Sequence, residues 1–297
     1  MTFVAPRYLL LYCIRRTTLK PMAFTVTSVN VNGIRAAHRK GMMEWLDANP
    51  CDVLLLQEVR ADEEIATELL GDSWESIILP CRIKGRAGVA VAVRKDSAHI
   101  SGEPRLFLDD QESDVDSGRW LEATVETGQG RVRVVSAYFH SGEKDTPKQD
   151  AKMAHLPRIG QRMGELLSEA AQGQTDVLGT VVAGDFNIVR TRSDIKNWTS
   201  NHNKRAGVLD EEIAFLDQWL DAGWHDVMRE LAGDVQGPYT WWSQRGQAFT
   251  NDTGWRIDYQ FATPVLAEKA TSFAIGRAAS YEERWSDHAP LSVSYEL

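Results

Sequence analysis

The 297-residue sequence contains no long apolar run and few cysteines. Because no stretch reaches the length of about 18 apolar residues that a membrane span requires, we expect no transmembrane helix and no membrane partner. The three cysteines, Cys13, Cys51 and Cys81, have the spacing of neither a disulfide framework nor a metal site. Both observations favour a globular protein of a reducing compartment, and we expect a cytoplasmic location.

Two common catalytic motifs are also missing. The sequence has no Gly-x-Ser-x-Gly nucleophile elbow and no Walker loop for nucleotide phosphates. Their absence disfavours a covalent intermediate and favours direct attack by water if the protein is a hydrolase.

Acidic residues outnumber basic residues by 42 to 33, and the formal net charge is −9. An acidic balance is unusual for a protein that binds nucleic acid, because phosphate binding depends on cations. The local field at a cleft matters more than the net charge, however. Short basic groups do occur near predicted loops: Arg35, Arg39 and Lys40; Arg82, Lys84 and Arg86; Lys196, Lys204 and Arg205. Each group taken alone is typical of a solvated surface.

Residues 1–22 differ from the rest of the chain. They contain basic residues, no acid, and the short apolar run Tyr8–Ile14. No Ala-x-Ala cleavage site follows this run, so a targeting segment is disfavoured. We expect a disordered extension or a true start at Met22, followed by one catalytic domain over residues 23–297.

Hydrophobic patterns along residues 23–297 predict more strands than helices. The predicted strands are 25–31, 52–57, 88–93, 131–139, 181–187, 257–263 and 291–295. The predicted helices are 41–48, 63–70, 148–171 and 211–222. Because several strands are consecutive, we expect an α/β fold, a four-layer sandwich of two mainly antiparallel sheets packed face to face with helices on both outer sides.

Polar side chains cluster where the predicted strands end. They are Asn30, Asn32, Gln57, Glu58, Asp185, Asn187, Asp258, Asp287 and His288. Any one of them would be typical of a turn or a surface charge, but the whole set favours a shared catalytic face. Oxygen ligands without clustered cysteine or histidine favour Mg²⁺, with Mn²⁺ as a substitute.

Several segments resemble, in order along the chain, the motifs of exonuclease III-type AP endonucleases of the endonuclease/exonuclease/phosphatase superfamily. They are Ser28–Ala36, Leu54–Glu58, Tyr138, Gly184–Asn187, Asp194–Trp198, Gly254–Tyr259 and Ser286–Pro290. The resemblance covers roughly residues 24–297. It implies a Mg²⁺-dependent, monomeric DNA repair nuclease that incises 5′ to abasic sites and removes nucleotides or blocking groups from 3′ ends of double-stranded DNA.

The resemblance also implies roles for individual residues. Glu58 would be the principal metal ligand, with Asn30, Asn32, Asp185, Asn187, Asp287 and His288 around the metal. His288, oriented by Asp258, would bind the scissile phosphate together with Tyr138. The implied DNA contacts are Arg35, Arg119, Asn197, Trp198 and Arg256, and the implied abasic pocket is Trp241, Trp255 and Ile257. The sequence leaves open whether Asp185, helped by Asn187, or the His288–Asp258 pair is the base.

Two positions depart from the family pattern. His140 stands where the family commonly has proline, and Ser117 stands where it usually has an acid. We interpret His140 as neutral for function, with a phosphate contact as the alternative. Two other functions remain alternatives: a phosphodiesterase or phosphatase of the same superfamily that acts on phospholipids, inositol phosphates or RNA, and an inactive DNA-binding protein. Trp198 and Trp255 disfavour the first, and the intact catalytic positions disfavour the second.

Overall fold

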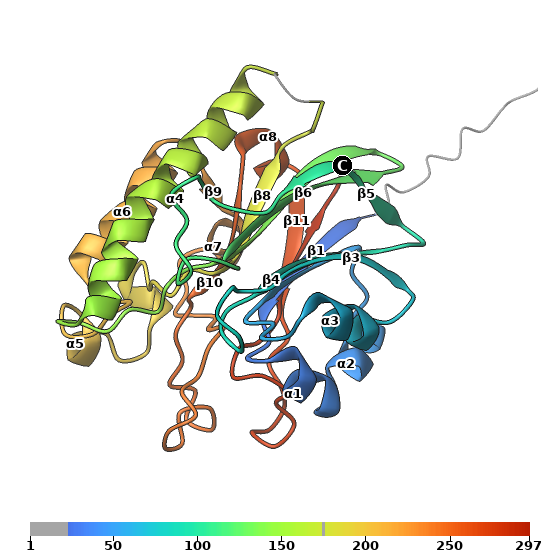
Figure 1. Ribbon diagram of the computed structural model, residues 1–297. Helices are drawn as coiled ribbons and strands as arrows, with labels where there is room; N and C mark the ends of the chain where they lie inside the picture. Colours follow the sequence, from blue (N-terminus) through green and yellow to red (C-terminus); the bar gives the residue numbers. More distant parts are fainter. Residues whose placement is uncertain (1–22, 174–175) are drawn as a thin grey trace, which may run out of the picture.

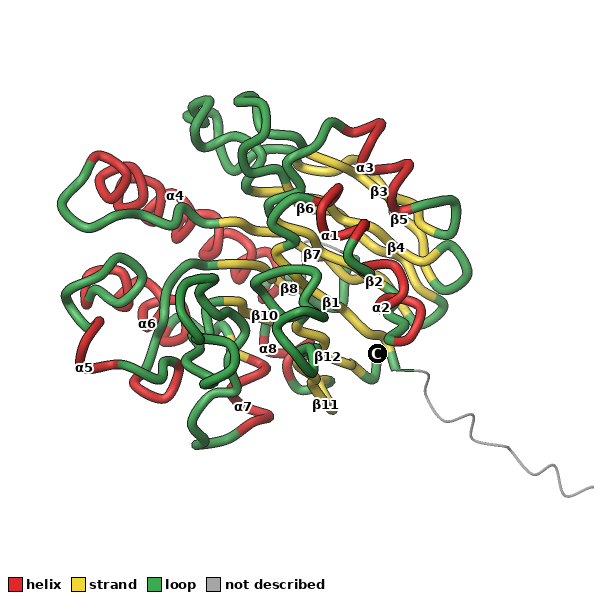
Figure 2. The backbone as a smooth tube through the Cα atoms, turned by 90° about the horizontal axis from the view of Figure 1, so that it is seen from below, coloured by secondary structure: helices red, strands yellow, loops and turns green. Residues whose placement is uncertain are grey.

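The computed structural model describes residues 23–173 and 176–297. The expected N-terminal extension, residues 1–22, lies outside the described residues. The described chain forms two six-stranded sheets packed face to face, with helices on both outer sides (Figures 1 and 2). The predicted four-layer sandwich is therefore confirmed.

The first sheet has the strand order β11-β12-β1-β2-β4-β3. Its strands are β1 (Phe24–Asn30), β2 (Val53–Gln57), β3 (Trp74–Leu79), β4 (Val89–Arg94), β11 (Ala270–Ile275) and β12 (Leu291–Tyr295). The pair β1 and β2 is parallel, and the other neighbours are antiparallel. The carboxyl ends of β1 and β2 therefore lie at the same edge.

The second sheet has the order β5-β6-β7-β8-β10-β9. Its strands are β5 (Ala98–Arg105), β6 (Trp120–Thr127), β7 (Gly130–Tyr138), β8 (Thr180–Asp185), β9 (His225–Asp226) and β10 (Asp258–Ala262). Here β7 and β8 are the parallel pair, and Tyr138 is in register with Asp185. The two sheets thus share a design in which one parallel pair lies among antiparallel neighbours.

Helices cover the two outer faces. On the first sheet they are α1 (Ile34–Arg39), α2 (Met42–Ala48) and α3 (Glu63–Leu70); on the second they are α4 (Pro147–Ala171) and α6 (Asp210–Asp221). Shorter helices are η1 (Arg192–Asp194), α5 (Trp198–Asn201), α7 (Val227–Ala232) and α8 (Pro264–Ala267). No helix in the described ranges is both long and apolar enough to cross a membrane.

The sequence of β2 shows why a central strand needs an uninterrupted apolar run. Val53 and Leu55 face the core between the sheets, and Leu54 and Leu56 face the core under α1–α3. Since successive side chains of a strand point to opposite faces, a strand covered on both sides needs apolar residues at every position. Truncating one of these leucines to alanine would cost about 2–5 kcal/mol.

The long helix α4 has a clear start signal and a clear apolar stripe. Thr146 caps it by accepting a hydrogen bond from the Lys148 amide at 3.3 Å, and Pro147 occupies the first turn. Leu156, Ile159 and Met163 are spaced by three and four residues and pack against the second sheet. This packing fixes the position of α4 behind the ends of β7 and β8.

Two predicted strands end earlier than expected. The strands predicted over 25–31 and 181–187 end at Asn30 and Asp185. The chain leaves each sheet because Asn32 and Asn187 adopt left-handed backbone conformations, with φ of 47° and 53°. Asparagine tolerates this region better than most residues do. The asparagines therefore bend the chain at the sheet edge instead of continuing the strands.

Candidate active site

Six chain segments meet at one edge of the sandwich. This edge lies at the bottom of Figure 1, where the loops 239–257 and 276–290 project from the sheets. The carboxyl ends of β1, β2, β7 and β8 reach it, and so do the amino ends of the antiparallel strands β10 and β12. Asp258 is directly opposite Asp185 in the ladder between β10 and β8. The topology thus places the predicted polar residues side by side.

A group of oxygen ligands surrounds the Glu58 carboxylate. The Asn30 amide donates to Glu58 Oε1 and to Asp185 Oδ2, both at 2.9 Å. The Asn32 amide donates to Asp287 Oδ1 at 2.9 Å, and the Tyr138 hydroxyl donates to Glu58 Oε1 at 2.6 Å. Three carboxylates and no cysteine thus converge here. This donor chemistry fits a hard divalent cation, which Glu58, Asp287 and Asp185 would hold.

The Arg60 guanidinium is an unexpected member of this group. It forms an ion pair with Glu58 Oε2, and Arg60 also has a left-handed backbone, with φ of 50°. Glu58 itself has φ of 50°, so the turn after β2 is strained at two non-glycine positions. Sequence reasoning missed Arg60, although a cation two residues after an acidic ligand was the available signal.

His288 lies between two buried aspartates. Its Nδ1 is 2.9 Å from Asp258 Oδ2, and its Nε2 is 3.7 Å from Asp185 Oδ2. Burial alone would lower the pKa of His288, but the carboxylates of Asp258 and Asp185 outweigh it and raise that pKa to about 10. The structure thus brings together the predicted His288–Asp258 pair and favours an imidazolium whose Nδ1 donates to Asp258 and whose Nε2 faces the cavity.

Asp185 is a buried carboxyl group of the site, with 1% of its surface exposed. Burial raises the pKa of Asp185 to about 7, although the charge of His288 opposes the rise. The Asn187 amide nitrogen of the backbone donates to Asp185 Oδ1 at 2.9 Å, and its side chain donates to Asp185 Oδ2 at 3.2 Å. A carboxyl group with a pKa near neutrality, held by these two hydrogen bonds and the one from Asn30, is suited to accept a proton from water.

Gly184 sets the position of Asp185. Its φ is +150°, and a Cβ atom there would lie 1.8 Å from the backbone oxygen of Ala137 on β7. No side chain fits at this distance. The glycine therefore permits the close approach of β7 and β8 that places Tyr138 beside Asp185.

The segment before β12 is fastened to the end of β1. The Ser286 hydroxyl donates to the Asn30 backbone oxygen at 2.6 Å and accepts from the His288 amide at 3.2 Å. Thr240 plays a similar part, because its hydroxyl oxygen accepts from the Asp258 amide at 3.2 Å. Sequence reasoning missed these positioning roles, which depend on partners far away in the chain.

A cavity of about 300 Å³ opens beside these groups. Its polar side is formed by Glu58, Tyr138, Asp185, Asn187, Asp287 and His288, and its apolar side by Trp241, Trp255 and Ile257. The two tryptophan rings meet edge to face with centroids 5.4 Å apart, and Trp241 Nε1 donates to Asp287 Oδ2 at 3.2 Å. The predicted pocket residues therefore line one wall of the cavity that contains the predicted catalytic residues.

The Arg119 guanidinium stacks over the Tyr138 ring, 4.7 Å from its centroid. Burial, reinforced by the charges of Glu58 and Asp185, raises the pKa of Tyr138 well above its usual range. The phenol is therefore a hydrogen-bond donor at neutral pH, and Arg119 adds a positive charge beside it. Tyr138 lines the cavity, whereas the Arg119 guanidinium donates to the backbone oxygens of Val115 and Tyr138 behind it.

Three of the predicted DNA contacts lie at the surface of the protein. Arg35 and Asn197 are exposed, and Trp198 is half-buried. Asn197 and Trp198 line a second cavity of about 610 Å³ together with Arg192, Lys196 and Lys204. This basic surface could accept a phosphate backbone.

The structure contradicts the predicted DNA contact of Arg256. This side chain is fully buried, and its guanidinium pairs with Asp194 and Asp226, each at 2.7 Å. A buried cation needs such partners because desolvation is costly. Arg256 therefore links the η1 turn to β9 beneath the site through its two ion pairs, and its buried side chain is not accessible to DNA.

The two departures from the family pattern lie behind the site. His140 Nε2 is 2.8 Å from Asp116 Oδ1, and neither residue lines the cavity. The Ser117 hydroxyl accepts from the Arg82 amide at 2.9 Å. The alternative of a phosphate contact by His140 is not supported, because the ring is buried against Asp116.

A family model described as the Endonuclease/Exonuclease/phosphatase family matches residues 27–288. Among similar proteins, an exodeoxyribonuclease of Bacillus subtilis is 27% identical over 270 residues, covering 90% of this chain and 97% of the relative. An AP endonuclease structure from Archaeoglobus fulgidus has a TM-score of 0.73 at 24% identity, covering 92% of this chain and 100% of that chain. A 3′ phosphatase NExo from Neisseria, bound to product DNA hairpin, has a TM-score of 0.72 at 25% identity, covering 92% and 99%.

Proposed function

The chain belongs to the endonuclease/exonuclease/phosphatase family, and we propose that it is a DNA repair nuclease that hydrolyses phosphodiester bonds of double-stranded DNA. It incises 5′ to abasic sites and removes nucleotides or blocking groups from 3′ ends. The observation that carries this proposal is the cavity in which Glu58, Asp185 and His288 face the apolar wall of Trp241 and Trp255. The relatives named as an exodeoxyribonuclease and a 3′ phosphatase support the same substrate class.

The proposed cofactor is Mg²⁺, with Mn²⁺ as a substitute, held by Glu58, Asp287 and Asp185 with Asn30 and Asn32 beside them. Bound there, the cation would neutralise phosphate oxygens and the developing alkoxide. The oxygen-rich donor set around Glu58 supports this choice.

Side chains around the cavity bind the scissile phosphate and accept the proton from water. His288, charged at neutral pH, donates from Nε2 to a phosphate oxygen while Asp258 holds Nδ1. A protonated imidazole has no free nitrogen to accept a proton, so Asp185 takes the base role, with Asn187 fixing its orientation. Tyr138, which lines the cavity, donates to the same phosphate, and Arg119 supports the Tyr138 ring from behind.

Substrate selection follows from the shape of the cavity. A nucleotide must leave the base stack to reach it, and this extrusion is easiest where no base is paired or stacked. The apolar wall of Trp241, Trp255 and Ile257 suits a bare deoxyribose. We expect the enzyme to act as a monomer, which sedimentation at several protein concentrations would test.

Cleavage assays on matched duplexes test this function. One duplex carries a single abasic site, one carries a 3′-phosphate, and one is undamaged; bis-p-nitrophenyl phosphate serves as a generic phosphodiester. We expect cleavage of the damaged duplexes that stops in EDTA and returns with Mg²⁺ or Mn²⁺. Glu58→Gln should raise the metal concentration needed. Turnover of the generic ester without cleavage of any duplex would refute the DNA repair assignment, and full activity in EDTA would refute the metal dependence.

A further inference from the structure

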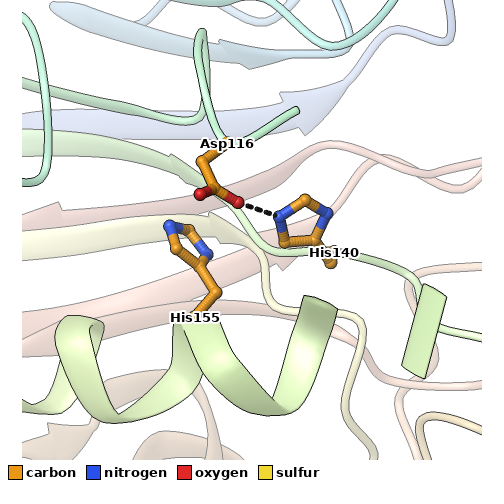
Figure 3. A group of neighbouring side chains, drawn as sticks. All are labelled: Asp116, His140 and His155. Carbon is orange, nitrogen blue, oxygen red and sulfur yellow. Dashed lines mark hydrogen bonds and ion pairs between the residues drawn. The ribbon is translucent and has the colours of Figure 1, made fainter. Parts of the chain in front are cut away.

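A second group of ligating side chains lies away from the cavity, and we refer to Asp116, His140 and His155 as the buried histidine cluster (Figure 3). Asp116 lies in the turn before β6, His140 follows β7, and His155 projects from α4. One ligand atom from each residue lies within 4.8 Å of those of the other two. Their exposed fractions are 8%, 9% and 3%. Nothing in the proposed nuclease reaction uses this group.

Hydrogen bonds account for only part of the cluster. Asp116 Oδ1 accepts from His140 Nε2 at 2.8 Å, and Oδ2 accepts from Arg158 at 3.0 Å and from the Ser113 hydroxyl at 2.8 Å. His155 Nδ1, in contrast, is buried and has no hydrogen-bond partner within the described part of the chain. Its ring nevertheless points from α4 toward the Asp116 carboxylate (Figure 3). A buried polar atom without a partner is costly, so an apolar residue would serve a purely structural cluster better.

The charge states are those of metal ligands. Burial, with the nearby charge of Arg119, lowers the pKa of His140 to about 4, and burial lowers the pKa of His155 to about 3. Hydrogen bonds from Ser113 and His140 hold the pKa of Asp116 below its usual range although burial opposes them. At neutral pH both imidazoles are therefore neutral and the carboxylate is ionised, as metal binding requires.

Three cations face the cluster, and two of them have carboxylates of their own. Arg158 is paired with Asp109 at 2.6 Å, and Lys152 with Glu212 at 2.8 Å. Arg119 is directed to the Tyr138 ring. Asp116, whose Oδ2 also pairs with Arg158 at 3.0 Å, is the carboxylate that would face a dication at the cluster through Oδ1.

We propose that Asp116, His140 and His155 bind a zinc ion that ties the turn before β6, the loop after β7 and helix α4 together. Zinc prefers nitrogen and oxygen ligands at about 2.0–2.1 Å in a tetrahedron, which separates ligand atoms by about 3.3 Å. The present spread of up to 4.8 Å needs only small side-chain shifts to reach that value. Three protein ligands leave the fourth position for water.

The cluster differs in kind from the catalytic ligands. The proposed Mg²⁺ ligands Glu58, Asp185 and Asp287 are all carboxylates, which suit Mg²⁺. The two neutral imidazoles of the buried histidine cluster suit zinc instead. Asp116 is three residues before Arg119, and His140 is two residues after Tyr138. Zinc would therefore fix the two segments that carry Tyr138 and its stacking partner Arg119 without touching the phosphate itself.

Calorimetric titration with Zn²⁺ tests the proposal. All proteins carry Glu58→Gln, which weakens metal binding at the catalytic edge. In that background we compare the parent with His155→Phe, which replaces the unpartnered ring by an apolar one of similar size, and with His140→Asn. His99→Ala is the matched control, because the His99 side chain is exposed and its ring lies 3.7 Å from the Glu126 carboxylate, away from the cluster.

We expect the parent and His99→Ala to bind one zinc ion more per chain than His155→Phe and His140→Asn do. Zinc at about 100 times its dissociation constant should raise the melting temperature of the parent by roughly 5–10 °C and that of His155→Phe much less. Circular dichroism without metal should show that His155→Phe is folded, because the change removes a buried polar atom. Equal zinc stoichiometry in the parent and His155→Phe, or no zinc binding by the parent, would overturn the proposal.

Discussion

The proposed catalytic group Asp185, Asp258 and His288 and the buried histidine cluster are built from the same two residue types, yet His288 is positively charged at neutral pH whereas His140 and His155 are neutral. In each group the ligand atoms lie within 4.8 Å of one another. His288 has a pKa raised to about 10, whereas His140 and His155 have pKa values lowered to about 4 and about 3.

The difference arises from the neighbours of each ring. His288 faces the carboxylates of Asp258, Asp185 and Asp287. In the buried histidine cluster, two rings share one carboxylate, and Arg119 is among the charges that oppose protonation. Burial disfavours a charged ring in both places. The ratio of carboxylates to imidazoles therefore decides whether a buried histidine is an anion-binding group or a neutral ligand.

The sharpest test of the comparison exchanges one carboxylate for an amide in the catalytic group. Asp185→Asn keeps the shape of the side chain and removes the proposed base, so kcat on abasic duplex should fall about 10²–10⁴-fold. DNA binding should survive, because the neutral side chain repels phosphate less. His155→Phe, the matched change in the other cluster, should lower kcat far less, because no residue of that cluster lines the cavity. Wild-type turnover of Asp185→Asn would contradict the base assignment.

A direct measurement of the three histidines would follow. In metal-free protein without DNA, the nitrogen chemical shifts of selectively labelled imidazoles report protonation. At pH 7 we expect two protonated nitrogens on His288 and one each on His140 and His155, because their pKa values lie on opposite sides of neutrality. Should His288 titrate near 6.5 like an exposed histidine, the comparison would fail.

The same difference should appear in the stability of the zinc-free protein at acid pH. His140 and His155 have folded-state pKa values below 6.5, so the unfolded state binds more protons once the pH falls below about 6.5. Each ring should then destabilise the fold by about 1.4 kcal/mol per pH unit until its own pKa is approached. Urea denaturation between pH 7 and 5 should show a shallower loss for His155→Phe than for wild type. Parallel curves would count against a neutral, buried His155.

The smallest expected effect concerns the apolar wall of the cavity beside the proposed catalytic group. The catalytic group opens on a cavity whose apolar wall includes half-buried Trp255, while the histidine cluster is enclosed. Trp255→Ala should reduce the preference for abasic over undamaged duplex by roughly tenfold. Stability should change far less than the 3–5 kcal/mol typical of a buried aromatic. A strongly destabilised variant with unchanged preference would place Trp255 in the core instead.

Much of the fold could be predicted from local patterns, and the exceptions have a physical cause. The run Val53–Leu56 predicts a strand buried on both faces, and it is one. The edge strand β5 was missed because Ala98–Arg105 is largely polar and half-exposed, with glycine and proline in it. Its pairing with β6 supplies the strand conformation that its own residues do not indicate.

The candidate site could be predicted wherever function places polar residues at strand ends. Asn30, Glu58 and Asp185 belong to motifs in which local sequence and site geometry agree. Arg256 could not be placed, because the acids that bury it, Asp194 and Asp226, are 62 and 30 residues away. The buried histidine cluster was missed for the same reason, since no local pattern connects Asp116, His140 and His155.

The close approach at Gly184 constrains how this chain can change over generations. A Cβ atom at that position would lie 1.8 Å from the Ala137 backbone oxygen. Any larger residue would therefore force β7 and β8 apart and destabilise the fold, whether or not the site is active. Asp185 is under no such restriction, because asparagine occupies the same volume. A duplicated copy released from selection for catalysis, but still required to fold, should therefore drift at Asp185 first and keep Gly184. Gly184 would then be retained for folding in a copy that has lost the catalytic carboxylate.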